Sequence, residues 1–282
     1  MSEMYVERRP SPALARVVRT IWMQRTGDGV YLQRHLPTGG VELQIPLGGS
    51  PTLAGPLTAH WIEPLPPRTT IVGVRFHPGA APPLPVVLDE LVNQRVPLAD
   101  LWGGLAARLA EAMAGALERT GRPEPAVGIL EAVLLREFRA AQHIDRLMRE
   151  AVAVLMPWHP VDVGAVAAHF ALSESQLRRR SLRTVGVSPK VLQRTLRFQG
   201  FLALAQAGVA ATDGIAGLAV GAGYSDQAHL TRECVRLTGV TPRTLLHGDL
   251  ERCACGHDHS ASYAPFLASR AVSPLGDLPF AR

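Results

Sequence analysis

The fold is decided by the stretch AVGAGYSDQAHLTR at residues 219–232, because an imperfect copy, AAHFALSESQLRRR, stands at residues 167–180. Each copy closes with Gly-x-Ser/Thr-Pro, at residues 186–189 and 239–242. Within each copy a short apolar segment is followed by a tight turn, a polar cap and a second helix. That order predicts two tandem helix-turn-helix units, a motif whose second helix enters the major groove of DNA.

The composition is that of a globular protein with room for two domains. The chain has 282 residues, 47% of them hydrophobic, and a mean hydropathy of +0.10. It shows no apolar run of the roughly 20 residues that cross a bilayer, no secretory signal pattern and only three cysteines, too few for a disulfide framework. We therefore expect a cytoplasmic protein with no membrane partner.

Positive charge is concentrated on the first repeat. The net charge of +5 is compatible with a polyanionic partner without establishing one. Between Ser173 and Lys190, however, five basic residues stand against one acid. A solvated basic helix face would look the same, but the repeat favours contact with DNA phosphates.

The sequence pattern of the first part of the chain is typical of a β domain. Residues 1–100 contain short apolar runs, such as 41–45 and 71–76, separated by Pro and Gly turns. This pattern predicts a mostly antiparallel β domain after one candidate helix at Pro12 to Trp22. Three tryptophans in this part are expected in its core: Trp22, Trp61 and Trp102.

Helices are expected from there to the end of the repeats. In a helical connector at residues 101–156, Asp100 is expected to cap a helix through Arg119, and a second helix runs from Pro125 to Leu155. This connector could join two domains, form a homodimer surface, or both. Residues 157–250 should hold the two units joined by a long helix, and 251–282 a tail, so the fold class is α+β. Caps are predicted at Asp162, at Ser173 with Gln176, and at Ser188 before Pro189.

The helix pattern divides each second helix into a buried and an exposed side. Leu177 and Leu230 should pack against the preceding helix. Leu182 and Val235 should pack on the linker or terminal helix. Cys234 is expected to be a core residue rather than a reactive thiol. The residues expected to face DNA are Ser175, Arg178, Arg179 and Arg183 in the first unit and Gln227, Ala228, Thr231 and Arg232 in the second. Arg can pair with guanine and Gln with adenine.

These motifs resemble the DNA-binding domain of the AraC/XylS transcription regulators. The resemblance covers residues 150–248 and rests on GYSDQAHLTR at 223–232 with its Gly-x-Thr-Pro end. It implies that the two recognition helices enter successive major grooves on one face of double-stranded DNA, and that RNA polymerase is a partner if the protein is an activator. The chain departs from the family at Ser181-Leu182, where an aromatic and a basic residue are usual.

The first half resembles the β-rich N-terminal domain of one AraC-type subgroup. This likeness is carried by GVRFHPG at residues 73–79 and VPLADLWG at 96–103. It implies a sensory or dimerising domain, with a small-molecule effector as a candidate partner.

A second pattern lies in the tail. Cys253, Cys255, His257 and His259 alternate with other residues, and both residue types suit zinc or another thiophilic metal. The alternative is a solvated, flexible tail. If metal binds, the protein would be a metal-responsive regulator that senses through the tail.

An enzyme, or a repair protein fused to a DNA-binding domain, is the weaker alternative. His35, His60 and His77 are isolated, and there is neither a nucleophile elbow nor a phosphate loop. The cysteines of such a repair fusion would precede the repeats, whereas Cys253 and Cys255 follow them. We therefore predict that the protein is not an enzyme.

Overall fold

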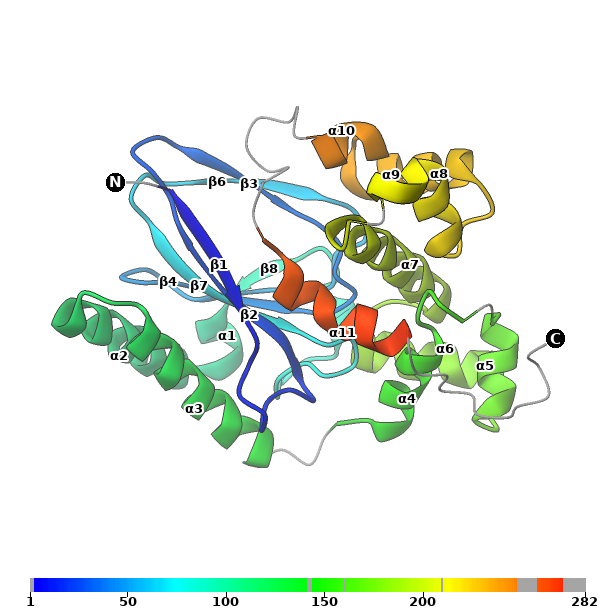
Figure 1. Cartoon of the computed structure of the whole chain (residues 1–282). Coiled ribbons are helices and arrows are strands. Elements are labelled where there is room, and N and C mark those ends of the chain that lie inside the picture. The colour runs from blue at the N-terminus through cyan, green and yellow to red at the C-terminus, as the bar shows by residue number, and fades with distance from the viewer. Residues whose placement is uncertain (1–2, 141–143, 160, 209, 248–257, 271–282) are drawn as a thin grey trace.

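The structure, a computed structural model, describes residues 3–140, 144–159, 161–208, 210–247 and 258–270. Its N-terminal part is built on a six-stranded sheet with the order β1-β2-β7-β4-β5-β8, beside a two-stranded sheet of β3 and β6. Neighbouring strands are antiparallel throughout. The strands are β1 (Met4–Arg8), β2 (Val18–Arg25), β3 (Tyr31–His35), β4 (Glu42–Pro46), β5 (Thr52–Ala54), β6 (Trp61–Leu65), β7 (Thr70–Phe76) and β8 (Arg95–Pro97). The predicted antiparallel β domain is thus confirmed (Figure 1).

The middle of the sheet is set by a tryptophan lying on a glycine. Trp22 of β2 is directly opposite Gly73 of β7, and a Cβ at position 73 would come within 2.0 Å of the indole. Only glycine therefore leaves room for this ring. Trp22 is buried as expected, whereas Trp61 and Trp102 are partly exposed.

The helix expected at Pro12 to Trp22 is wrong. Turns occupy the first part of that segment, and β2 begins at Val18. The strand pairs with β1 on one side and β7 on the other. Backbone pairing on both edges and burial of β-branched side chains outweigh the local helical spacing of the apolar residues.

Helices cover one face of the sheet. The 3-10 helix η1 (Leu88–Leu91) precedes α1 (Leu98–Trp102), α2 (Gly104–Thr120) and α3 (Glu124–Ala140). α2 and α3 pack on each other below the sheet in Figure 1, and their buried residues share one core with it, including Leu109, Met113 and Leu130. The first helices of the expected connector therefore belong to the N-terminal domain.

Two details of the connector differ from expectation. Asp100 lies inside α1 and caps nothing, because α1 begins at Leu98 and Gly103 separates it from α2 with a φ of +53°. The expected second helix is two helices, α3 and α4 (Arg146–Val154). Asp145 caps α4 by accepting a 3.0 Å hydrogen bond from the Met148 amide.

The C-terminal helices follow the predicted order. They are α5 (Val163–His169), α6 (Glu174–Val185), α7 (Pro189–Gln206), α8 (Ala210–Gly221), α9 (Gln227–Thr238) and α10 (Pro242–His247). The predicted caps are confirmed at Asp162, at the Ser173–Gln176 capping box and at Ser188. Two helix-turn-helix units are therefore joined by α7. No helix in the described ranges is long and apolar enough to cross a membrane.

A further helix lies in the segment expected to be a tail. α11 (Ser260–Arg270) packs on α7, β1 and β2, and Figure 1 shows it crossing between the sheet and α7. Phe266 is buried, and the Trp158 indole donates a 3.0 Å hydrogen bond to its carbonyl. Residues 260–270 are therefore part of the folded body.

Candidate DNA interface and interdomain pocket

The first recognition helix is α6. Leu177 is fully buried in the cluster that contains Val166 and Ala167 of α5, which confirms the predicted packing. The predicted DNA-facing residues of this unit are all exposed: Ser175, Arg178, Arg179 and Arg183. The capping box leaves the helix N-terminus ordered and facing outward. The helix therefore presents three exposed arginines, Arg178, Arg179 and Arg183, that form no ion pair with a described residue.

The second recognition helix is α9. Leu230 is fully buried, while Gln227, Ala228 and Arg232 are exposed. Thr231 is half-buried, and its hydroxyl donates a 2.8 Å hydrogen bond to the Gln227 carbonyl. Asp226 caps the helix, and the hydrogen bond from the His229 amide helps to lower the pKa of its carboxyl. This helix carries two arginines, whereas α6 carries four.

Two ion pairs orient the recognition helices. Arg180 of α6 pairs with Asp145, the cap of α4, at 2.5 Å. Arg194 of α7 pairs with Glu233 of α9 at 3.2 Å. The Asp145 carboxylate thus serves both a helix cap and an arginine, which makes Arg180 a positioning residue in the structure. Sequence reasoning missed both pairs, because their partners lie 35 and 39 positions apart without a motif.

The expected packing of Val235 is wrong. Val235 is 43% exposed, and Leu182 is only half-buried. The buried positions at the ends of the two helices are Val185 and Leu237 instead. The prediction that Cys234 is a core residue is confirmed, because its side chain is fully buried and burial raises the pKa of its thiol to about 11. A thiol of that kind is unreactive at neutral pH.

The N-terminal domain contacts the far ends of both recognition helices. At Gly186, just after α6, a Cβ would lie 2.7 Å from Pro56 and 2.8 Å from the Leu88 carbonyl. At the end of α9, Arg34 of β3 donates a 2.7 Å hydrogen bond to the Thr238 carbonyl. The two units are thus held by separate parts of the same domain.

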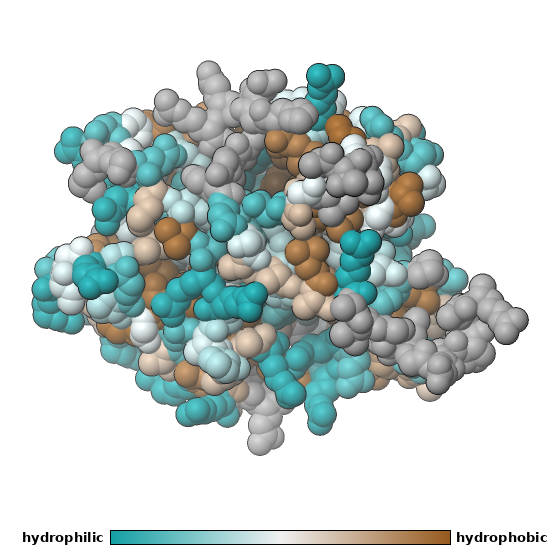
Figure 2. All heavy atoms as spheres, viewed as in Figure 1, coloured by the Kyte–Doolittle hydropathy of each residue, from teal (hydrophilic) through white to brown (hydrophobic). Residues whose placement is uncertain are grey.

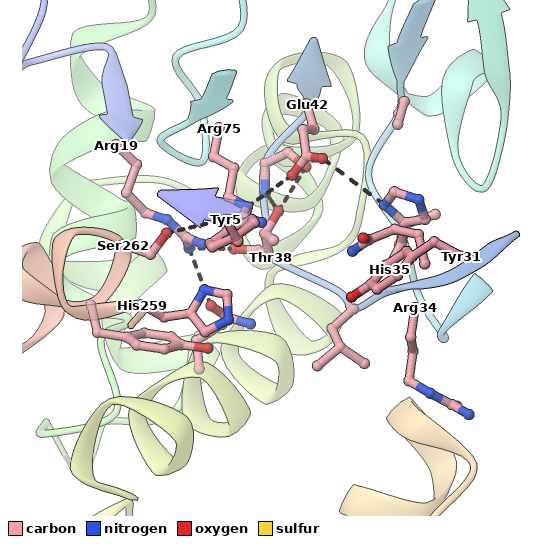
Figure 3. Close-up of a pocket in the computed structure, with 18 residues that line it drawn as sticks. Tyr5, Arg19, Tyr31, Arg34, His35, Thr38, Glu42, Arg75, His259 and Ser262 are labelled. Atoms are coloured by element: carbon pink, nitrogen blue, oxygen red, sulfur yellow. Dashed lines mark hydrogen bonds and ion pairs between the residues drawn. The ribbon is translucent and has the colours of Figure 1, made fainter. Parts of the chain in front are cut away.

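A cavity of about 100 Å³ lies between the six-stranded sheet, the β3-β6 sheet, α7 and α11 (Figure 3). Its walls combine aromatic and aliphatic groups with a group of charged ones. The polar lining residues include Arg19, Arg34, His35, Glu42, Arg75 and Gln199. These residues come from four strands or their flanking loops and from α7, so the cavity exists only when both domains are assembled.

Glu7 is the hub of the ionic network beside this cavity. Its side chain is 1% exposed and accepts hydrogen bonds from Tyr5, Arg75, His259 and Ser262. Burial alone would raise the pKa of this carboxyl, but the hydrogen bond from His259 and the charge of Arg75 outweigh it and lower the pKa strongly. Glu7 therefore stays ionised and ties β1 to α11.

A second carboxylate stands on the other side of Arg75. The Arg75 Nε is 2.9 Å from Glu42 and its Nη1 contacts Glu7, so this guanidinium has two acidic partners. Figure 3 shows Arg75 beside Glu42. On the β3-β6 sheet, Glu63 of β6 pairs with His35 and Arg95. Burial would raise the pKa of Glu63, but these two partners lower it. The acids of this wall are thus all matched by bases.

Arg19 lies beside this ionic network. It is 3% exposed, and its Nη1 donates to the Gln199 Oε1 at 3.2 Å and to the Thr38 carbonyl at 3.4 Å. Burial and the charge of Arg75 lower its pKa to about 10, so it remains a cation. Sequence reasoning missed the whole pocket, because its residues are spread from position 5 to position 263.

The predicted metal ligands fall mostly outside the described residues. Cys253, Cys255 and His257 lie there, and nothing about them can be placed. His259 is described, and its Nδ1 is 2.9 Å from Glu7. Across the residues that the structure places, no group of three His, Cys, Asp or Glu side chains could hold a metal ion. Metal binding by the tail stays a prediction.

Comparison with known proteins agrees with the repeat. Residues 166–248 match a family described as a helix-turn-helix domain, and residues 6–97 match a domain of unknown function. The segment 166–248 is therefore a helix-turn-helix domain of the AraC type, the DNA-binding domain of a class of transcription regulators. No curated protein matches the chain.

Solved structures of ToxT from Vibrio cholerae are similar over most of the chain. The crystal structure of ToxT from strain O395 is 12% identical, with a TM-score of 0.42, over 86% of this chain and 96% of that one. ToxT from strain SCE256 with bound unsaturated fatty acid is 9% identical, with a TM-score of 0.41, over 91% of this chain and 98% of that one.

Proposed function

We propose that the protein is a sequence-specific transcription regulator whose two recognition helices read successive major grooves of one DNA site. The observation that carries this proposal is the exposure of the predicted reading residues on both helices, while Leu177 and Leu230 are fully buried behind them. Arg, Gln and Ser are side chains that read base edges or contact phosphates.

The two helices would have unequal roles. α6 presents Arg178, Arg179 and Arg183, which suits attachment to phosphates as well as readout of guanine. α9 presents Gln227 and Arg232 with less charge around them. We infer that the first unit contributes more to affinity and salt dependence, and the second more to discrimination between sequences. The DNA site would accordingly be asymmetric.

The N-terminal domain would modulate this binding through the interdomain cavity. It touches the ends of both α6 and α9, and the cavity lies where the sheet meets α7. A small molecule in the cavity would therefore contact both domains at once. A change there would bias how the two units are held relative to each other.

The test is selection of bound sequences from random double-stranded DNA, followed by binding at several salt concentrations. We expect one asymmetric consensus, bound at least about 10³-fold more tightly than unrelated DNA. Footprinting should show two protected patches about one helical turn apart on one face. A specific-to-nonspecific ratio near unity, or a single patch, would overturn the proposal.

A further inference from the structure

The two recognition helices share an aliphatic side chain that packs on no core. Val235 of α9 is 43% exposed, and Leu182 of α6 is half-buried. Neither residue belongs to a hydrophobic cluster of the described residues or packs against one. A single exposed valine would need no explanation, but these two residues lie 53 positions apart, which is the separation of the repeats. The same feature therefore occurs at the same place in both units.

Val235 extends the row of residues predicted to face DNA on α9. It stands seven, four and three positions after three of them: Ala228, Thr231 and Arg232. Positions at these separations share one face of an α-helix, while the buried Leu237 lies on the opposite face. Val235 is therefore the last member of this row, about one turn beyond Arg232.

Leu182 occupies the corresponding place on α6. It follows three exposed residues that are predicted to face DNA, at the same separations: Ser175, Arg178 and Arg179. Homeodomain recognition helices read bases with four side chains spaced in this way, at intervals of three, one and three residues. A helix in the major groove can therefore bring the last residue of such a row to the bases.

The chemistry of this position selects its partner on DNA. An aliphatic side chain offers no hydrogen bond to a base or a phosphate, and the apolar group that the major groove presents is the C5 methyl of thymine. A protein partner would need a contiguous apolar area, whereas the exposed Arg236 and Arg183 directly follow Val235 and Leu182. On the face of the molecule in Figure 2, hydrophobic groups likewise form small patches among hydrophilic ones. A single methyl group suits these two places better than a protein surface.

We propose that Val235 and Leu182 are specificity-determining residues, each of which packs against the C5 methyl group of one thymine in the DNA site. The inference rests on the proposed function and names part of what the two units read. Burial of one methyl group against an aliphatic side chain should raise affinity about fourfold. Cytosine at that place is disfavoured more strongly, because its amino group would be left without an acceptor.

The helix geometry also places the two thymines. Val235 lies three residues beyond Arg232, which is about 4.5 Å along the helix axis, and base pairs follow one another about every 3.4 Å. Its thymine should therefore lie about one or two base pairs from the base that Arg232 reads. Leu182 stands in the same relation to Arg179. Because the units are expected in successive major grooves, the two thymines should be about one helical turn apart.

Deoxyuridine tests the methyl group alone, because it lacks the C5 methyl of thymidine and keeps the same hydrogen-bonding groups. Each thymine of the selected DNA site is replaced in turn, and the affinity of the full chain is measured by fluorescence anisotropy. We expect one position for each unit at which the replacement weakens binding about fourfold. A site in which no replacement lowers the affinity, or in which both expected places hold G·C pairs, would overturn the proposal.

Two variants link each methyl group to its side chain. In Val235→Ala the deoxyuridine effect should be lost at the position of the second unit and stay unchanged at that of the first, and Leu182→Ala should show the reverse. Such a cycle measures the contact itself, so a loss of protein stability does not imitate it. Val30→Ala, at an exposed valine before β3, is the control and should keep both effects. If both effects persist in both variants, the assignment of these side chains is wrong.

The outcomes separate this inference from the proposed function. If selection from random DNA yields no consensus, the regulator and the thymine contacts are both refuted. A consensus whose thymines all tolerate deoxyuridine overturns the thymine contacts and leaves the regulator intact. An effect that is lost in one variant alone supports the contact of that residue and overturns the contact of the other.

Discussion

The Arg34 guanidinium donates a 2.7 Å hydrogen bond to the backbone carbonyl of Thr238, the last residue of the second recognition helix. A cation suits this place, because carbonyls at a helix C-terminus have no partner within the helix and carry partial negative charge. The β3-β6 sheet thereby fixes the end of α9, although 204 positions separate the two residues.

Arg34→Ala should loosen the second unit alone. A hydrogen bond from a charged donor contributes about 1.5–3 kcal/mol, so amide exchange in α9 and α10 should be at least about tenfold faster. Hydrogen exchange followed by mass spectrometry gives this rate, and peptides from α6 serve as the internal reference. Arg68→Ala, in an exposed ion pair with Asp28, should change neither helix. Equal acceleration in α6 and α9 would mean that the contact acts on the whole domain.

Arg179→Ala and Arg232→Ala should each weaken binding to the selected DNA site without unfolding the protein. Both side chains are exposed, and a base contact contributes about 1–3 kcal/mol. Affinity is measured by fluorescence anisotropy and stability by thermal unfolding. Arg122→Ala, exposed on the turn between α2 and α3, is the matched control. If either variant loses stability but keeps its affinity, that arginine faces the protein rather than DNA.

Arg180→Ala should behave differently from its neighbour Arg179. Its guanidinium is paired with Asp145, so its removal frees the end of α4 rather than a DNA contact. For a partly exposed pair we expect a loss of about 1 kcal/mol in the free energy of unfolding. The salt dependence of DNA binding should stay unchanged, whereas loss of a phosphate contact would lower its slope by about one. A reduced slope would show that Arg180 reaches DNA.

Glu7→Gln should release α11. The substitution keeps the shape but removes the charge that receives hydrogen bonds from His259, Ser262 and Arg75. Breaking a buried ion pair from one side costs about 3 kcal/mol or more. Urea unfolding measures the loss, and limited proteolysis should cut within residues 258–270 first. Glu3→Gln, exposed before β1, should be neutral; a similarly stable Glu7→Gln protein would refute the role of the ion pair.

Mild acid should destabilise the protein through His77. Burial and the charge of Arg19 lower the pKa of His77 to about 4, whereas an unfolded histidine titrates near 6.5. The unfolded chain therefore takes up a proton first, so this stability is full above pH 6.5 and is lost as the pH falls toward 4. Between pH 7 and 5 the loss from His77 is on the order of 2 kcal/mol.

The His77→Gln variant isolates this effect from that of other groups. Burial also lowers the pKa values of His60 and His159, so these residues destabilise the protein in mild acid as well. The contribution of His77 is therefore the difference in pH dependence between the native protein and the variant. Glu7 acts in another range, because the stability from a carboxyl with a lowered pKa is lost only below about pH 4.5. Urea midpoints at pH 7 and 5 that shift equally in both proteins would exclude His77.

The features that could be predicted from the sequence are those determined by interactions between residues close together in the chain. The Ser173–Gln176 capping box and the cap at Asp162 form within one helical turn, so the bond and its motif occupy the same few positions. The buried Leu177 and Leu230 follow from helical periodicity in the same way. Short-range hydrogen bonding and side-chain period are sufficient to place these elements.

The features that were missed depend on distant partners. Nothing in the local sequence distinguishes Arg19 from an ordinary strand arginine, because its hydrogen-bond partner Gln199 lies 180 positions later in the chain. Helix α11 is stabilised by Glu7 and by α7 rather than by its own sequence, which has Pro265 inside it. The helix expected over Pro12 to Trp22 failed because two flanking strands decide its conformation. Long-range pairing of this kind leaves no periodic signal along the chain.

The contact between α11 and β1 also sets an order of events during synthesis. The carboxylate of Glu7 receives its partners from residues 259 and 262, more than 250 positions later. On the ribosome the sheet and both DNA-reading units can form before those residues emerge. Only the last part of the chain then closes the wall of the cavity and fixes α7 on the sheet. A nascent chain would thus have both helix-turn-helix units folded before the cavity is closed.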